Sequence, residues 1–146
     1  MFVFKSGFIA IVGRPNVGKS TFFNAVIGDK ISIVAAKPQT TRNRITGIRN
    51  ASDAQLIFLD TPGVHRAKTP LNRAMVQAAR DTVGDADLIL AMIQAGDAIG
   101  PQDRYLIETL AGVRTPVFLA VNKIDRVEKT SLLPLLDEAS RLFDLA

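Results

Sequence analysis

Short, continuous apolar runs alternate with amphipathic segments along this chain of 146 residues. Apolar runs bounded by turn signals predict buried strands at residues 8–12, 88–93 and 117–121. Helical spacing of apolar positions predicts helices at residues 19–27, 71–83, 101–110 and 132–145, the last beginning near Ser131. Gly28 suits the left-handed residue that ends a helix, and Pro101 and Pro134 suit the first turns of the third and fourth helices.

Two further strands are predicted around a short turn. Residues 45–49 and 55–59 flank the turn signal at residues 50–53, which predicts an antiparallel hairpin. Residues 29–41 have no steady period and are expected to form an irregular loop. Apolar strands that alternate with helices are typical of a mostly parallel sheet covered on both faces. The expected fold is therefore a doubly wound α/β domain with helices on both faces of the sheet.

Composition limits the class of protein. A chain of this length with 47% hydrophobic residues suits one globular domain with a core. No apolar run reaches the roughly 18 residues that span a bilayer, and the run at residues 8–12 is too short for a signal peptide. The chain has no cysteine and one histidine, His65, which excludes disulfides, thiolate metal sites and multi-histidine metal sites. We expect a cytoplasmic protein, with peripheral membrane association left open.

The net charge of +4 hides an uneven distribution. Residues 1–80 contain twelve Lys and Arg against three Asp and Glu, whereas residues 81–146 contain six against eleven. A basic half can bind a polyanion, either nucleic acid or the phosphates of a ligand, but charged surfaces also serve solubility alone. Charge therefore leaves both interpretations open.

A glycine-rich segment joins the first strand to the first helix. Residues 13–20, GRPNVGKS, match the pattern G-x-x-x-x-G-K-[ST], which occurs by chance in about one chain of this length in 200. In this pattern the glycines let backbone amides surround phosphates, the helix N-terminus adds positive charge, Lys meets the β- and γ-phosphates and Ser binds Mg²⁺. We expect the phosphates to be bound by Gly13, Asn16, Val17, Gly18, Lys19, Ser20 and Thr21.

A second motif, D-x-x-G, follows the third strand at residues 60–63. The pattern alone is common, and its position at the carboxyl end of a strand beside the phosphate loop is what makes it informative. There Asp60 can hold the water shell of Mg²⁺, and the Gly63 amide can donate to a γ-phosphate. The same residues could also form an ordinary turn.

A third motif, N-K-x-D, follows the last apolar strand. Asn122, Lys123 and Asp125 form this pattern, which occurs by chance in roughly one chain in 50. A carboxylate at Asp125 can accept hydrogen bonds from N1–H and the 2-amino group of guanine, whereas adenine offers neither donor there. Sites built on such pairings discriminate by ~10⁴ or more, so guanine is favoured over adenine.

The order of these three motifs resembles that of the translation-factor-like P-loop GTPases, with a Ras-like GTPase domain. Residues 13–20 and two further segments, KPQTTR at 37–42 and DTPGVH at 60–65, resemble the bacterial Era family within the TrmE–Era group. The resemblance runs from about Gly7 to Phe143. It implies that GTP and GDP are the ligands and that 16S rRNA and the small ribosomal subunit are partners of the full-length relative.

The resemblance also implies roles for residues outside the motifs. Thr41, or failing it Thr40, is the switch residue that would bind Mg²⁺ in the GTP form and act with Lys19 and Gly63 in catalysis. Asn16 is similar to the asparagine through which relatives bind K⁺. The oligomeric state is left open.

The residue that orients water in Ras-like enzymes is missing here. Those enzymes have a glutamine directly after the D-x-x-G glycine, and this chain has Val64. Intrinsic hydrolysis is therefore expected to be slow. His65 as a base and Arg42 or Arg44 as a charge-stabilising finger are less favoured than solvated loop residues.

Two features of the family are absent from the sequence. No Ser-Ala signal, whose backbone would contact guanine O6, follows Asp125, and the last strand and helix are missing with it. We therefore expect residues 1–146 to be a C-terminally truncated GTPase domain, without the KH RNA-binding domain of its relatives. The strand at 117–121 would then have an unpaired edge, which predicts low stability or self-association.

The function predicted from these residues is a GTP-binding and GTP-hydrolysing switch. A guanine-nucleotide-binding module without useful turnover is an alternative, favoured by Val64 and the missing C-terminal elements. A direct RNA-binding protein that uses the basic half is another, and an ATP-dependent kinase is the weakest. GTP hydrolysis, salt-sensitive RNA binding and base preference would separate these four.

Overall fold

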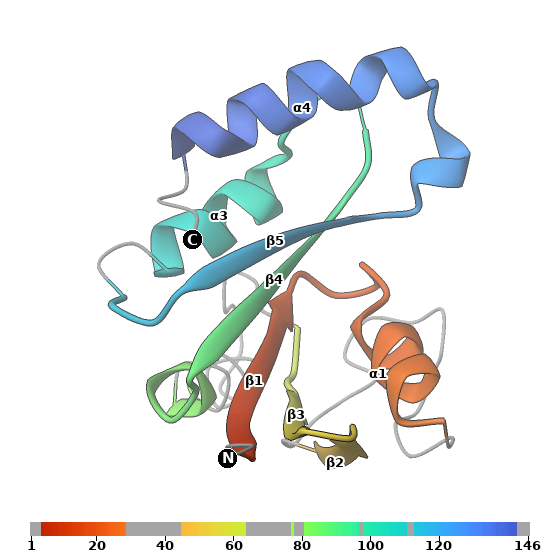
Figure 1. The fold of residues 1–146 in the computed structure, drawn as a ribbon. Helices are drawn as coiled ribbons and strands as arrows, with labels where there is room; N and C mark the ends of the chain where they lie inside the picture. Colours follow the sequence, from red (N-terminus) through yellow and green to blue (C-terminus); the bar gives the residue numbers. More distant parts are fainter. Residues whose placement is uncertain are drawn as a thin grey trace.

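A five-stranded sheet forms the centre of the computed structural model, which describes residues 4–28, 45–63, 77, 81–96, 98–110 and 113–142. The strands lie in the order β2-β3-β1-β4-β5, and their bounds are β1 Lys5–Gly13, β2 Ile45–Asn50, β3 Ala54–Asp60, β4 Leu88–Gln94 and β5 Val117–Asn122 (Figure 1). All neighbours pair in parallel except β2 and β3, which form the predicted antiparallel hairpin. The mostly parallel α/β fold is thus confirmed.

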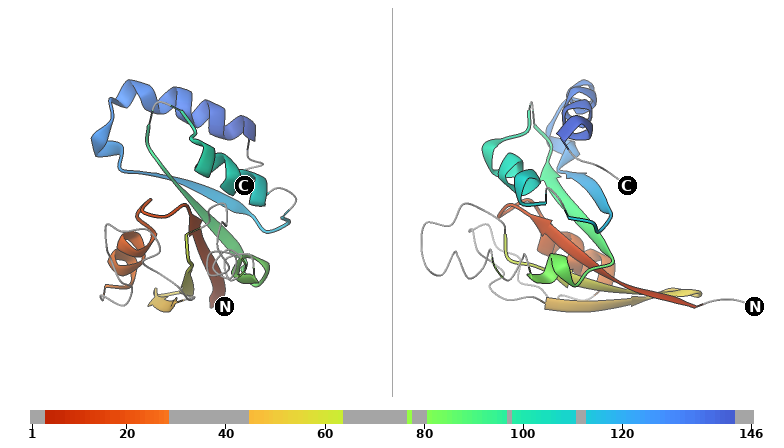
Figure 2. Two further views of the ribbon diagram at one scale, coloured as in Figure 1. Left: turned by 180° about the vertical axis from the view of Figure 1, so that it is seen from behind. Right: turned by 90° about the vertical axis from the view of Figure 1, so that its left-hand side faces the viewer.

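The first strand is longer than its apolar run. It begins at Lys5, whereas the sequence pattern predicted a start at Phe8. Parallel pairing with β3, from Lys5 opposite Ala54 to Ile11 opposite Asp60, extends the strand over polar residues that apolar periodicity does not detect. In the side view of Figure 2, the start of β1 and the β2–β3 hairpin extend together away from α3 and α4.

The observed bounds of the helices agree with the prediction where a glycine or a proline marks a helix end. α1 (Lys19–Ile27) ends at Gly28, whose φ of 90° is left-handed and whose N–H donates to the Asn24 carbonyl oxygen. α3 (Pro101–Leu110) has the predicted bounds. Of the helix predicted at 71–83, residue 77 and residues 81–84 are helical and the rest lie outside the described residues.

The last helix begins earlier than predicted. α4 (Lys129–Leu142) starts two residues before Ser131, and Pro134 is its sixth residue, still within the first turns as predicted. Both the backbone N–H and the side-chain hydroxyl of Ser131 donate to the carbonyl oxygen of Glu128, which stabilises this extra turn. The predicted end at residue 145 lies outside the described residues.

Two hydrophobic clusters cover the two faces of the sheet. On one face α1 packs through Phe23 against Ile11, Val17, Phe58 and Met92. On the other face α3 and α4 pack against β1, β4 and β5 through Leu106, Ile107, Leu110, Leu135 and Ala139. Figure 1 shows α1 on one side of the sheet and α3 with α4 on the other, as the doubly wound fold requires.

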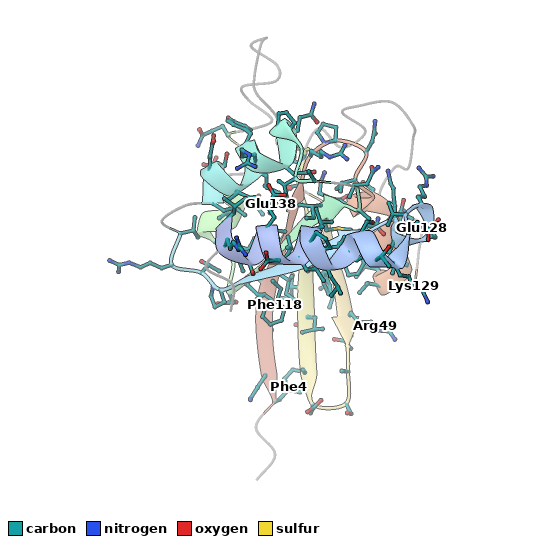
Figure 3. All side chains as sticks on the ribbon, turned by 90° about the horizontal axis from the view of Figure 1, so that it is seen from above. Phe4, Arg49, Phe118, Glu128, Lys129 and Glu138 are labelled. Carbon is teal, nitrogen blue, oxygen red and sulfur yellow. The ribbon has the colours of Figure 1, made fainter. Side chains whose placement is uncertain are left out.

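A side-chain contact fastens α4 to α3. Glu138 accepts a hydrogen bond from the Ile99 N–H at 3.2 Å and one from Arg104 Nη2 at 2.8 Å. In Figure 3, which looks down onto α4, Glu138 lies on the side of that helix next to α3. The contact holds the loop before α3 in place.

The strand β5 lies at the edge of the sheet. Within the described part of the chain it pairs with β4 alone, and its Phe118 is 51% exposed. This agrees with the edge strand predicted from the sequence, although nothing in the structure tests its effect on stability or self-association. No helix among the described residues is long and apolar enough to cross a membrane.

Gly47 allows β2 to lie close against α1. A Cβ added there would lie 2.7 Å from Phe23 Cζ and 2.7 Å from Ile27 Cγ1, and Phe23 is fully buried. We predict that Gly47→Ala lowers the free energy of unfolding by about 1–3 kcal/mol through overpacking, as measured by urea denaturation. Gly100→Ala is the matched control, because nothing lies within 4 Å of its added Cβ. Equal stability of the two variants would contradict this packing.

Candidate functional site

The carboxyl ends of four strands meet at one edge of the sheet. β1, β3, β4 and β5 run parallel, and they end at Gly13, Asp60, Gln94 and Asn122. In open α/β sheets ligands bind at this edge, in the crevice outside the carboxyl ends of the strands. Three of these four residues belong to the motifs recognised in the sequence.

The loop between β1 and α1 is shaped by two residues with positive φ. Asn16 has a φ of 62° and Gly18 a φ of 109°, and Gly18 is the N-cap of α1 without a side-chain cap. The first N–H groups of a helix have no partner within the helix, and backbone in this alternating conformation makes an anion-binding concavity. The loop therefore has the local geometry of a phosphate cradle.

Each remaining loop residue has a distinct environment. Val17 is fully buried in the α1 cluster, so only its backbone can meet a ligand. Thr21 is exposed in the first turn of α1. Gly13 is enclosed, because an added Cβ would lie 2.6 Å from the Met92 carbonyl oxygen.

Lys19 is buried in the centre of this loop. Its Nζ donates to the carbonyl oxygens of Gly13 and Arg14, both at 3.0 Å, and the residue is 6% exposed. Burial lowers the pKa of Lys19 to about 8, although the Asp60 carboxylate opposes this and Arg14 adds to it. In the described part of the chain these two carbonyl oxygens are the acceptors of Lys19, and a cation so held can gain stronger, charged partners when phosphates enter.

A hydroxyl and a carboxylate meet beside the phosphate loop. Ser20 Oγ donates to Asp60 Oδ2 at 2.9 Å, and Asp60 is fully buried at the end of β3. Hard oxygen donors of this kind are the ligands that Mg²⁺ prefers. The residues present thus fit a magnesium ion that would accompany nucleotide phosphates.

The D-x-x-G segment lies against the phosphate loop. A Cβ added to Gly63 would lie 2.8 Å from the backbone nitrogen of Pro15, so only glycine permits this approach. Thr61, which the sequence analysis did not single out, is fully buried and donates from Oγ1 to the Ile11 carbonyl oxygen at 2.7 Å. That bond ties the segment to β1 and fixes Gly63 near the loop.

The N-K-x-D motif is joined directly to the same loop. Asn122 Nδ2 donates to the Val17 carbonyl oxygen at 2.8 Å, and Lys123 Nζ donates to the Asn16 carbonyl oxygen at 2.6 Å. A Cβ on Gly18 would collide with Asn122 Nδ2, which adds a second reason for glycine there. Asp125 follows exposed in the 3-10 turn η1 (Ile124–Arg126). Motifs more than a hundred residues apart are therefore in direct contact at this edge of the sheet.

Some predicted residues lie outside the described part of the chain. These are Thr41 with the whole segment 29–44, and residues 64–76, which include Val64 and His65. The structure thus brings together Lys19, Ser20, Asp60 and Gly63 around the phosphate loop, with Asn122 and Lys123 alongside.

Two polar residues that the motifs do not include contact Arg14 of the phosphate loop. Gln94 ends β4, and its Oε1 accepts hydrogen bonds from Arg14 Nη2 at 3.1 Å and from Lys123 Nζ at 3.0 Å. Asp103 in α3 pairs with Arg14. A polar residue directly after an apolar strand was the available signal for Gln94, since Asp60 and Asn122 follow their strands in the same way.

Fold and site together define a domain of the P-loop GTPase class. The family model described as 50S ribosome-binding GTPase matches residues 8–123, and the chain belongs to that family. A curated relative, GTPase Era of Syntrophus aciditrophicus (strain SB), is 55% identical over 144 residues, which are 99% of this chain and 47% of the relative. The chain therefore spans about half the length of the curated relative that it matches, and the resemblance to Era is confirmed over its whole extent.

Solved structures agree with this relationship. A crystal structure of Era in complex with MgGDPNP and nucleotides 1506–1542 of 16S ribosomal RNA is 41% identical, with a TM-score of 0.88 over 94% of this chain and 47% of that one. A single-residue variant of Aquifex aeolicus Era bound to GDP·AlF4⁻ is 42% identical, with a TM-score of 0.87 over the same shares. NFeoB from S. thermophilus bound to GDP·AlF4⁻ and K⁺ is more distant, at 30% identity and a TM-score of 0.62 over 82% of this chain and 45% of that one.

The lowered pKa of Lys19 predicts a pH dependence of nucleotide binding. Phosphates beside Nζ stabilise the ammonium, so binding raises a pKa that is about 8 in this structure. GDP should therefore bind with uptake of most of one proton at about pH 8.5. The affinity of the chain for GDP should fall as the pH rises above 8, by at most about tenfold per pH unit. Below pH 7 Lys19 is already protonated, and the uptake should vanish.

Isothermal titration calorimetry in two buffers of different ionisation enthalpy measures this uptake. The same titration at about pH 7.2 is the internal control, because most Lys19 is charged there. Proton release at the higher pH, or equal uptake at both, would mean that Lys19 does not meet the phosphates.

Proposed function

We propose that this chain binds GTP and GDP and hydrolyses GTP as the switch domain of a longer, Era-like protein. The observation that carries the proposal is the direct bonding of Asn122 and Lys123 to the backbone of the phosphate loop. These bonds hold the N-K-x-D motif beside the phosphate loop. One nucleotide that contacts both the motif and the loop requires this arrangement. The GDPNP and GDP·AlF4⁻ complexes of the Era relatives support it.

In this proposal each motif has one task. The amides of Gly13–Thr21 and the ammonium of Lys19 bind the phosphates, and the Asp125 carboxylate accepts hydrogen bonds from the guanine edge. Ser20 would hold Mg²⁺ directly, Asp60 would hold it through its water shell and Thr41 would complete the site; the ion supplies charge neutralisation at the phosphates. The Gly63 N–H donates to the γ-phosphate, so that the contact is lost when this phosphate leaves.

Hydrolysis is proposed to proceed by in-line attack of water on the γ-phosphorus, with Lys19 and backbone amides stabilising the charge that develops. The bond from the γ-phosphorus to the bridging oxygen breaks, and GDP and phosphate result. With Val64 after Gly63, no side-chain amide is available at that position to orient the water, so we propose a slow intrinsic rate.

Potassium is proposed as an activating ion. Asn16 is exposed in the phosphate loop and has a φ of 62°. The NFeoB relative that contains K⁺ with GDP·AlF4⁻ supports this choice. A monovalent cation near the phosphates adds the positive charge that an arginine finger supplies in other GTPases.

The wider role rests on the Era relationship. We propose that the whole protein acts in assembly of the small ribosomal subunit through 16S rRNA. The crystal structure of an Era relative with 16S rRNA supports this RNA partner. We further propose that the protein lies in the cytoplasm, with partial peripheral membrane association. The exposed edge of β5 and the half-length match support the view that a further strand, helix and Ser-Ala loop complete the GTPase domain and that an RNA-binding domain follows.

Single-turnover hydrolysis tests the proposed activity. With Mg²⁺ and K⁺ we predict release of phosphate from GTP above the buffer rate, and a rate at least about tenfold lower when Na⁺ replaces K⁺. Asn16→Ala should remove most of the difference between the two ions while leaving GDP binding within about threefold.

The same assay separates GTP hydrolysis from nucleotide binding without turnover. GTP binding with no phosphate release in either salt would leave a nucleotide-binding module without turnover. A K⁺ effect that persists in Asn16→Ala would contradict the role of this asparagine but not GTP hydrolysis itself.

A further inference from the structure

Arg14, the second residue of the phosphate loop, is held by a carboxylate from another element. Its Nε lies 3.1 Å from Asp103 Oδ1 and 3.3 Å from Asp103 Oδ2, and Asp103 belongs to the first turn of α3. The Asp103 side chain is 7% exposed and that of Arg14 is 24% exposed. An ion pair this well shielded from water differs from a surface salt bridge, because removal of one partner leaves a charge in a buried place.

The same guanidinium is linked to the base motif through Gln94. Gln94 Oε1 accepts from Arg14 Nη2 at 3.1 Å and from Lys123 Nζ at 3.0 Å, so one amide oxygen lies between two cations. Lys123 Nζ also reaches the Asn16 carbonyl oxygen. Burial lowers the pKa of Lys123, and the positive charges of Arg126 and Arg14 add to that effect. A neutral acceptor and a nearby carboxylate are what allow these cations to lie together.

The backbone of Arg14 also determines where Lys19 lies. The Arg14 carbonyl oxygen is one of the two that accept hydrogen bonds from Lys19 Nζ. Asp103 is thus linked to Lys19 by two contacts. Asp103 contacts the side chain of Arg14, and the carbonyl oxygen of Arg14 accepts a hydrogen bond from Lys19 Nζ. Burial raises the pKa of Asp103, and the positive charge of Arg14 opposes this shift. Burial thus disfavours the charged form of the Asp103 carboxyl.

We propose that Asp103 and Gln94 are positioning residues for nucleotide binding, which hold Arg14 so that the phosphate loop stays open and in register with the base motif. The proposal rests on the proposed nucleotide-binding function of this site. It adds two residues, from β4 and α3, that touch neither phosphates nor base.

The neighbouring residue in α3 provides a matched comparison. Arg104 also makes a cross-element ion pair, with Glu138 at 2.8 Å, but this pair faces α4 and not the phosphate loop. Asp103→Asn and Arg104→Gln each remove one charge from the same helix turn. A merely structural role of both pairs predicts loss of stability in both variants and no change in nucleotide release.

The experiment measures dissociation of fluorescent GDP from the full chain by stopped flow, alongside urea unfolding of each variant. We expect Asp103→Asn to release GDP about tenfold faster, since it leaves Arg14 without its charged partner. Arg104→Gln should release GDP at the wild-type rate. The double variant Arg14→Gln with Asp103→Asn should release GDP no faster than the faster single variant, because the two side chains act as one unit.

Each outcome decides the proposal. Unchanged GDP release in Asp103→Asn, with or without loss of stability, overturns the proposal. Strictly additive effects of Arg14→Gln and Asp103→Asn on the rate of GDP release also overturn it. If Asp103→Asn does not fold, Gln94→Ala decides instead, with about threefold faster release expected and an unchanged rate contradicting the proposal. Failure of the wild-type chain to bind GDP would overturn the proposed function first, so the two failures are distinguishable.

Discussion

Parallel pairing of four strands is the constraint on which the site depends. Because β1, β3, β4 and β5 run in the same direction, their carboxyl ends meet at one edge of the sheet, where ligands bind in open α/β sheets. Gly13, Asp60, Gln94 and Asn122 come from four separate segments and are brought together by backbone register alone. The apolar interiors of the strands, packed between α1 on one face and α3 with α4 on the other, hold that register.

Within the phosphate loop a buried cation, Lys19, is the next constraint. The Lys19 ammonium lies where burial disfavours its charge, and the carbonyls of Gly13 and Arg14 satisfy it only partly. A loop with this shape is costly for stability and useful for binding polyanions. Contacts from outside the loop therefore bear on its function: Thr61 ties the D-x-x-G segment to β1, Asn122 holds the Val17 carbonyl, and Asp103 holds Arg14.

Local signals predicted much of this fold and the motif residues of the site. α1 and α3 have the predicted bounds because a glycine or proline marks an end, and the phosphate loop lies in the predicted strand-to-helix connection. The starts of β1 and α4 were wrong, since strand pairing and a hydrogen bond to Glu128 decide them rather than apolar spacing. Gln94 and Asp103 were missed because they contact Arg14 across 80 and 89 residues of sequence, where no local pattern exists.

The proposed function requires that one guanine nucleotide span the phosphate loop and Asp125. Equilibrium titration of Asp125→Asn with GDP and with xanthosine diphosphate tests it most directly, because xanthine has a carbonyl where guanine has the 2-amino group and an asparagine amide can donate to it. We expect the substitution to weaken binding of GDP by at least about 100-fold and to strengthen binding of xanthosine diphosphate relative to the wild type. An unaltered preference for GDP over xanthosine diphosphate would contradict it.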